Sequence, residues 1–190
     1  MLPSRLSAIC ALIVMLLAGC AQDNVVEPPV ELGNFKLGFA VVVADSAEKV
    51  PISRTADPAA WKKSLTDALN RRLKRYDGEK FFNLGVSVDA YALAPPGVPL
   101  VISPKSALVI SVTVWDDAAG KKLNEKPEQF TIFEGLSGDT IVGSGLTKTA
   151  EEQMATLSFN AARRVERYLA DNPQLFGLPP KPPRPTESSR

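Results

Sequence analysis

The order of apolar repeats along the chain is the feature that most limits its fold. Apolar residues alternate with period two over residues 35–43, 84–92 and 107–115, and two shorter strands are expected at 129–134 and 140–146. Residues 58–76 and 149–170 instead carry apolar side chains at helical spacing. The order β-α-β-β-β-β-α predicts an α+β fold, a two-layer sandwich of two helices on a four- to five-stranded, mostly antiparallel sheet. The first two strands can pair in parallel through the helix between them.

Local signals support the boundaries of both helices. Asp57 followed by Pro58 is typical of a helix start, and Thr149 with Glu152 forms a capping box. Gly78 fits a C-terminal cap of the first helix, and Asp171-Asn172-Pro173 ends the second. In the first strand, period two places Phe35, Leu37, Phe39, Val41 and Val43 on one face.

The N-terminal segment predicts export and a lipid anchor. Its apolar run, Ile9 to Ala18, is too short to span a membrane, which takes about 20 residues, but suits the core of a secretory signal. The run ends in Leu17-Ala18-Gly19-Cys20, which resembles the lipobox of bacterial lipoproteins. The resemblance implies cleavage before Cys20, lipid on its thiol and attachment to the membrane. Because Ala21 follows instead of aspartate, it also implies the periplasmic face of the outer membrane rather than the inner membrane.

Four segments follow from this interpretation. Residues 1–19 form the signal peptide, 20–34 the lipidated N-terminus and tether, 35–178 a single α+β domain and 179–190 a Pro-rich disordered tail. A tether ending at residue 34 spans at most about 50 Å, so the domain stays close to its bilayer.

Composition excludes several kinds of chemistry. The chain has no histidine, and its two cysteines are Cys10, lost with the signal, and Cys20, which takes the lipid. Thiol catalysis, Ser-His-Asp triads and zinc sites built on histidine or cysteine therefore lack their residues. The 22 basic and 21 acidic residues, including Arg5 in the signal, nearly balance, which argues against nucleic-acid binding. No metal and no cofactor are expected.

The mature region carries a second, weaker resemblance. The stretch Val112-Thr113-Val114-Trp115-Asp116-Asp117 is similar to uncharacterised envelope lipoproteins of alphaproteobacteria. The element order also resembles several small envelope lipoproteins, including auxiliary lipoproteins of transport systems. Neither resemblance brings an activity with it.

Two features are candidate contacts. The outer side of the first helix is basic and can either lie on anionic headgroups or remain solvated; its residues are Lys62, Lys63, Arg71, Lys74 and Arg75. Trp115 is either a packing residue or, if exposed, a partner contact.

These observations predict a non-catalytic accessory or binding protein, anchored in the membrane at Cys20 and directed at another envelope component, which is expected to be a protein. The alternative is an enzyme that uses carboxylates on cell-wall or lipid substrates, with Asp116, Asp117, Glu134 and Asp139 gathered at one sheet edge. Adjacent aspartates before Ala-Ala-Gly are, however, also typical turn formers.

Overall fold

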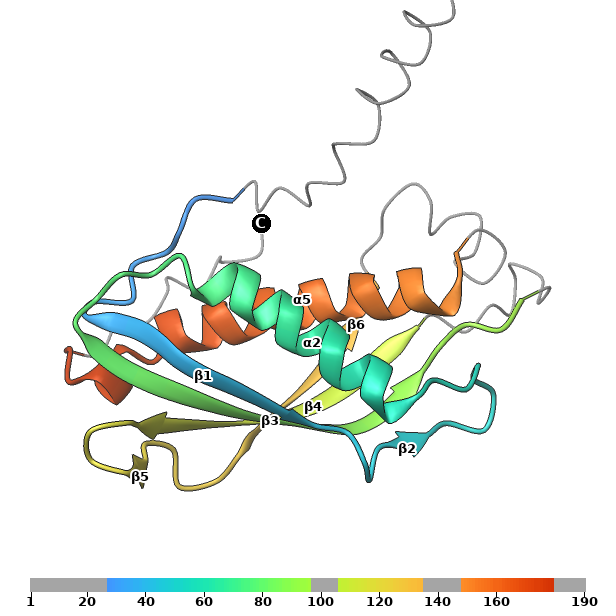
Figure 1. Cartoon of the computed structure of the whole chain (residues 1–190), viewed down its shortest axis with the longest axis horizontal. Coiled ribbons are helices and arrows are strands. Elements are labelled where there is room, and N and C mark those ends of the chain that lie inside the picture. The colour runs from blue at the N-terminus through green and yellow to red at the C-terminus, as the bar shows by residue number, and fades with distance from the viewer. Residues whose placement is uncertain (1–26, 97–105, 135–147, 180–190) are drawn as a thin grey trace, which may run out of the picture.

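Two long helices lie side by side on one face of a mixed sheet (Figure 1), as the predicted α+β sandwich requires. The computed structural model describes residues 27–96, 106–134 and 148–179. Its elements are β1 (Phe35–Val43), β2 (Glu48–Lys49), α2 (Pro58–Leu73), β3 (Lys80–Ala92), β4 (Ala107–Asp116), β5 (Lys121–Lys122), β6 (Glu128–Phe133), α5 (Ala150–Asp171) and the 3₁₀ helix η2 (Pro173–Phe176).

The sheet is built around β3 and β4, which pair antiparallel over most of their length. β1 pairs parallel with β3, and α2 forms the connection between them, as predicted. β6 pairs antiparallel with β4 on the other side. The two-residue strands β2 and β5 extend the pairing of β3 and β4 beyond β1 and β6. Among the described residues, β1 is therefore an edge strand.

Both helices begin where the sequence indicates. The Asp57 carboxylate accepts a hydrogen bond from the backbone N–H of Ala59 at 2.9 Å, with Pro58 in the first turn. The Thr149 hydroxyl accepts from the N–H of Glu152 at 3.1 Å, and the Glu152 carboxylate accepts from the N–H of Thr149 at 2.7 Å. This is the predicted capping box. α2 ends at Leu73, three residues before the predicted end.

The core fills the space between the helices and the sheet. α2 and α5 present fully buried side chains every three or four residues, and β3 and β4 present theirs at alternate positions. Fully buried members are Trp61, Leu65, Leu69, Leu73, Leu108, Ile110, Val112, Val114, Leu157, Ala161, Val165 and Leu169. The sheet face away from the helices is not covered by a second layer of described residues.

The predicted face of β1 is wrong beyond Leu37, because a bulge interrupts the strand. Leu37 pairs with Phe82 and Ala40 with Leu84, so two residues of β1 lie opposite Asn83. The Asn83 side chain accepts a hydrogen bond from the N–H of Phe39 at 2.8 Å and so satisfies the bulged backbone. A bulge shifts the alternation by one residue. Phe35 and Leu37 consequently face the core, whereas Phe39, Val41 and Val43 face outward.

Gly78 does not cap α2, contrary to the prediction. The helix ends at Leu73 with Lys74 as its C-cap residue, and Gly78 lies beyond this cap, where the chain crosses the start of β1. Its N–H donates to the Phe35 carbonyl at 3.1 Å. A Cβ at this position would lie 2.4 Å from the Asn34 carbonyl carbon, so glycine is needed for the close approach of two backbones.

Several predictions lie outside the described residues. They concern Cys20 with the signal and lipobox, the strand expected at 140–146, Asp139 and the Pro-rich tail from residue 180 onward.

Candidate functional site

The seam between α2 and α5 is hollowed on its solvent side. The helices run parallel, since Ser64 meets Ser158 (Oγ to Oγ, 2.9 Å) and Arg72 meets Glu166 further along. The two residues that meet there, Ser64 and Ser158, have small side chains. On the solvent side the helices leave a groove of about 620 Å³.

The groove combines an apolar floor with charged walls. Ala60 and Ala68 of α2 and Met154, Ala155 and Phe159 of α5 supply its apolar lining. The walls carry Lys63, Asp67, Arg71, Arg72 and Glu151. Lys63 and Asp67 form an exposed ion pair at 2.6 Å. A hollow of this size is within the range of about 300–1,000 Å³ that is typical of small-ligand sites.

A buried ionic cluster, made of Arg72, Arg75, Tyr76, Glu166 and Glu27, closes the C-terminal end of this seam. Glu166 accepts hydrogen bonds from Arg72 Nε at 2.7 Å, Arg75 Nη2 at 2.6 Å and the Tyr76 hydroxyl at 2.6 Å. Arg72 and Glu166 are each only 3% exposed. Three donors therefore converge on one carboxylate that water barely reaches.

The segment before β1 is held on the helices by the same cluster. Arg72 Nη2 donates to the Glu27 carboxylate at 2.8 Å, and Arg75 Nη1 donates to the Glu27 carbonyl at 2.7 Å. Arg163 of α5 forms a further ion pair with Glu27. Leu32, further along the segment, is 3% exposed. The chain is thus fixed to the outer side of the helix layer from Glu27 onward.

The surroundings of the cluster shift the pKa of two of its groups. The hydrogen bond from Arg72 lowers the pKa of Glu27 below its ordinary value, and the charge of Arg163 acts in the same direction. Burial, together with the hydrogen bond to Glu166, raises the pKa of Tyr76 to about 12. At neutral pH, Glu27 is ionised and Tyr76 keeps its proton, as the hydrogen bonds require.

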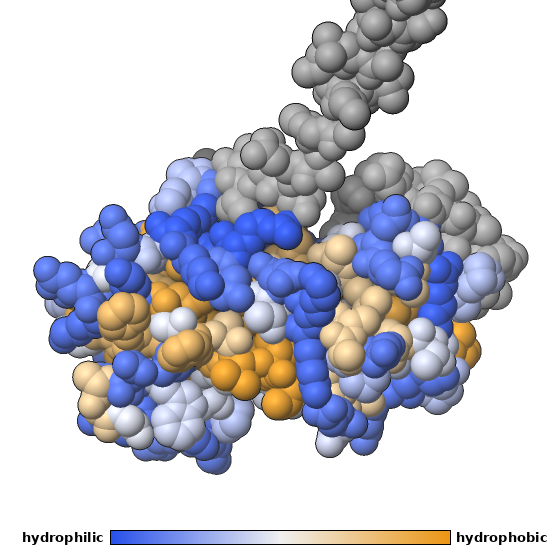
Figure 2. All heavy atoms as spheres, viewed as in Figure 1, coloured by the Kyte–Doolittle hydropathy of each residue, from blue (hydrophilic) through white to orange (hydrophobic). Residues whose placement is uncertain are grey.

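The opposite surface is the outer face of the sheet. The bulge turns Phe39, Val41 and Val43 of the edge strand outward, with exposures of 69%, 60% and 49%. Figure 2 shows an apolar patch over the part of the sheet where β1 lies, below the helices. Phe81, at the start of β3, is paired with Lys36 of β1 and is itself 47% exposed. Exposed apolar side chains on an open edge strand are unusual, because such edges pair readily with other chains.

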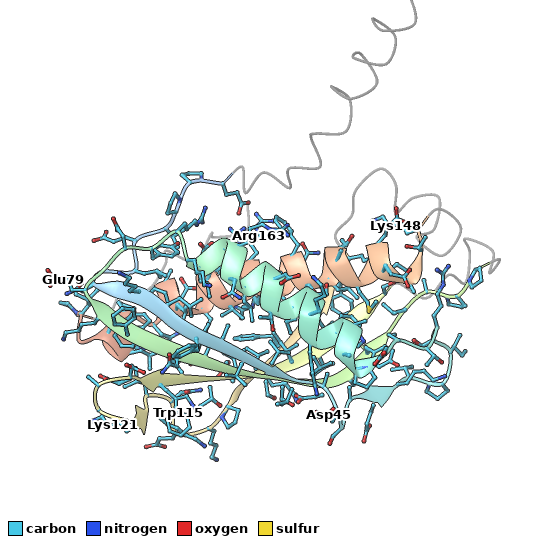
Figure 3. All side chains as sticks on the ribbon, viewed as in Figure 1. Asp45, Glu79, Trp115, Lys121, Lys148 and Arg163 are labelled. Carbon is cyan, nitrogen blue, oxygen red and sulfur yellow. The ribbon has the colours of Figure 1, made fainter. Side chains whose placement is uncertain are left out.

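The predicted contact residues do not form one surface. Lys62 pairs with Asp45 at 2.7 Å and Lys63 with Asp67, while Arg75 lies inside the ionic cluster. Arg71 and Lys74 are exposed on α2. Trp115 lies on the outer sheet face, half-buried, with Lys122 Nζ 5.5 Å from its ring centre. Trp115 and Arg163 of α5 are on opposite sides of the sheet (Figure 3), so the tryptophan faces away from the helix layer.

The carboxylates of the enzyme alternative also lie apart. Asp116 ends β4 and accepts from the Ala119 N–H in a turn, whereas Glu134 follows β6 beside Ser106, at the other end of β4. Ten strand residues separate those ends, which corresponds to about 33 Å. Asp117 accepts from the Asn83 amide at 2.7 Å. Within residues 27–96, 106–134 and 148–179, no group of three or more Asp, Glu, His or Cys residues is arranged to hold a metal ion.

Sequence reasoning missed both the groove and the ionic cluster. A signal was present, because Arg72 continues the buried stripe of Trp61, Leu65 and Leu69, and Glu166 directly follows the buried Val165. Opposite charges beside the apolar stripes of two helices indicate a buried pair, but their distance of 94 residues in sequence hides the pairing. In the part of the chain that the structure describes, no helix is both long and apolar enough to span a membrane.

Comparisons with known proteins give distant likenesses only. No protein-family model matches the chain, and no curated protein matches it. Among solved structures it is similar to a Xanthomonas campestris protein of the DUF330 family, with 13% identity, 78% of this chain and 93% of that chain covered, and a TM-score of 0.45. A hypothetical protein of Chlamydia trachomatis has 11% identity, coverage of 70% and 97%, and a TM-score of 0.43. A minor lipoprotein of Acinetobacter baumannii has 13% identity, coverage of 72% and 94%, and a TM-score of 0.34. Such distant likenesses assign no function.

Proposed function

We propose that the protein is a bacterial lipoprotein, anchored at Cys20 on the periplasmic face of the outer membrane, which binds another envelope protein through the outer face of its sheet. The observation that carries the proposal is the open edge strand β1, whose bulge exposes Phe39, Val41 and Val43. A partner strand can pair with such an edge while its side chains cover the apolar patch. The proposed role needs no catalysis.

The attachment point of the N-terminal segment supports this arrangement. Glu27 is fixed on the helix layer by Arg72 and Arg163. Only six residues lie between Cys20 and Glu27, so these two residues are at most about 25 Å apart. An anchor at Cys20 therefore holds the helix layer near the bilayer. The outer sheet face lies on the other side of the domain, where a periplasmic partner can reach it.

The anchor is tested with Cys20→Ser. We expect this variant to lose labelling by a tagged fatty acid and to accumulate as uncleaved precursor, because the thiol that takes the lipid is gone. Density-gradient separation of the two membranes tests the outer-membrane location of the wild-type protein. Normal processing and labelling of the variant would contradict the lipoprotein assignment.

The partner surface is tested by a photo-reactive amino acid placed at Val41 in the full chain, followed by irradiation of intact cells and mass spectrometry of the adducts. We expect one reproducible protein adduct at Val41 that is lost when Phe39→Asp is added. The matched control carries the photo-reactive residue at Lys74, which is exposed on the helix side. Equal adducts at both positions, or none at Val41, would contradict binding through β1.

A further inference from the structure

We propose that the groove between α2 and α5 holds one acyl chain of a membrane phospholipid. This inference rests on the proposed anchor, because the anchor brings the groove to the bilayer. It concerns the opposite side of the domain from the partner surface.

The dimensions of the groove fit one acyl chain. Its α2 wall runs from Ala60 to Arg72, twelve residues that rise about 18 Å along the helix axis. Half of a hydrocarbon core of about 30 Å, the length of one acyl chain in a leaflet, is about 15 Å. The groove is therefore as long as the chain it is proposed to hold, and its volume is about 620 Å³.

The lining has the chemistry for an alkyl chain. Five lining residues have no polar side-chain atoms: Ala60, Ala68, Met154, Ala155 and Phe159. The hydroxyls of Ser64 and Thr156 also line the groove and donate to Ser158 and to the Glu152 carbonyl. Methionine adapts its shape to irregular apolar ligands. The charges that line the groove and the adjoining hollow around Glu27 balance, which favours a mainly apolar ligand over a polyanion. They are Lys63, Arg71, Arg72, Arg163 and Arg167 against Glu27, Asp67, Glu151, Glu166 and Asp171.

One polar group at the inner end of the groove is unsatisfied. Arg72 lines the groove and donates through Nε and Nη2 to Glu166 and Glu27. Its Nη1 is buried and has no hydrogen-bond partner among the described residues. Buried donors are nearly always paired in folded proteins. An ester or phosphate oxygen of a lipid that enters from this end would complete the hydrogen bonding of Arg72.

The position of the groove indicates where the acyl chain comes from. The groove and the hollow beside Glu27 share Arg72, so they are neighbouring parts of one seam. A tether of at most about 25 Å between Cys20 and Glu27 keeps this seam next to the lipid surface. Membrane phospholipid is therefore the acyl-chain source that is always within reach.

The test uses the full chain in its own cells, with a photo-reactive amino acid at Ala155 in the groove wall. After irradiation and purification, we expect an adduct with the mass of a phospholipid at Ala155. The matched control has the same residue at Ala59, which is exposed on α2 but does not line the groove. Ala68→Trp, which fills the groove from the opposite wall, should abolish the Ala155 adduct, whereas Ala59→Trp should leave it unchanged. Circular dichroism spectra of both tryptophan variants serve to check that they fold like the wild type.

Three other patterns of adducts would overturn the proposal. Equal lipid adducts at Ala155 and Ala59 would show that the helix face merely touches the bilayer, and a protein adduct at Ala155 would show that a polypeptide fills the groove. A link between Ala155 and the peptide that starts at Cys20 would show that the protein's own anchor fills it. An anchored protein without an adduct at Ala155 refutes the groove alone. If the protein is not associated with the membrane but still gives the lipid adduct at Ala155, the anchor alone is refuted. If it shows neither membrane association nor the adduct, both the anchor and the groove proposal are refuted.

Discussion

Replacing Glu166 by glutamine tests the energetic role of the ionic cluster. The side chain keeps its size but loses its charge, while Arg72 and Arg75 stay in place. In the native protein, Glu166 accepts from both arginines and from Tyr76, and it is 3% exposed. In the variant, Arg72 keeps the Glu27 carboxylate as its acidic partner in the cluster, whereas Arg75 keeps only its hydrogen bond to the Glu27 backbone carbonyl.

The size of the effect follows from this burial. Removing one partner of a buried ion pair costs about 3–5 kcal/mol, because the other charge remains desolvated and unpaired. Glutamine keeps one acceptor oxygen and so recovers part of this loss. We therefore expect Glu166→Gln to lower the free energy of unfolding by about 3 kcal/mol. A domain of ordinary stability has only about 5–15 kcal/mol in total, so the loss is readily measured.

The assay is urea unfolding of the purified protein, followed by tryptophan fluorescence, because Trp61 is fully buried in the native core. The matched control is Asp67→Asn, which removes one carboxylate from an exposed ion pair of α2. Such a pair contributes about 0.5 kcal/mol or less. Equal losses in the two variants, or a loss below about 1 kcal/mol for Glu166→Gln, would refute the reasoning from burial.

Three further predictions concern single positions. Gly78→Ala should lower the free energy of unfolding by about 1–3 kcal/mol, because its Cβ would meet the Asn34 backbone; Gly85→Ala, whose Cβ meets nothing closer than 4.0 Å, should cost clearly less in the same urea titration. In an absorbance titration of phenolate, one tyrosine should ionise near pH 12 and should be missing in Tyr76→Phe. Its raised pKa stabilises the fold below pH 10, and this contribution should be lost between pH 10 and 12. The pKa of Glu27 is lowered in the folded protein, so the ionised carboxylate stabilises the docked segment at pH values above the ordinary pKa of 4.5. This stabilisation is lost as the pH falls through the pKa of the folded state. Cleavage of the wild-type protein by a protease near residue 27 should therefore become faster in acid. The Glu27→Gln variant should be cleaved faster than the wild type already at neutral pH.

The partner surface and the lipid groove are formed by different parts of the chain. Phe39 and Val41 belong to an edge strand that is already paired on one side with β3, so substitutions there leave the core packing intact. Ala155 is exposed on α5, and Ala68 of α2 is only partly buried at the margin of the core. Partner binding and lipid binding can therefore be changed separately, and neither set of substitutions removes a fully buried side chain.

Features that depend on near neighbours in the chain could be predicted from the sequence. The capping box of Thr149 and Glu152 and the start of α2 at Asp57 are contacts over two or three residues, and the structure contains both. The alternation of β4 is likewise a local property, and its buried face is the predicted one. These signals were sufficient for the two-layer α+β architecture, because periodicity alone separates helix from strand.

Features that join distant segments could not be predicted in this way, because they depend on contacts in the folded domain. The outward turn of Phe39 depends on Asn83, 44 residues later, which stabilises the bulge in β1. Gly78 is needed because the chain crosses β1 there, although its position after a helix suggested a cap. The pairing of Arg72 with Glu166 spans 94 residues. Register, backbone approach and buried charge pairing are set by which surfaces meet in the folded domain, and a single sequence does not record those encounters.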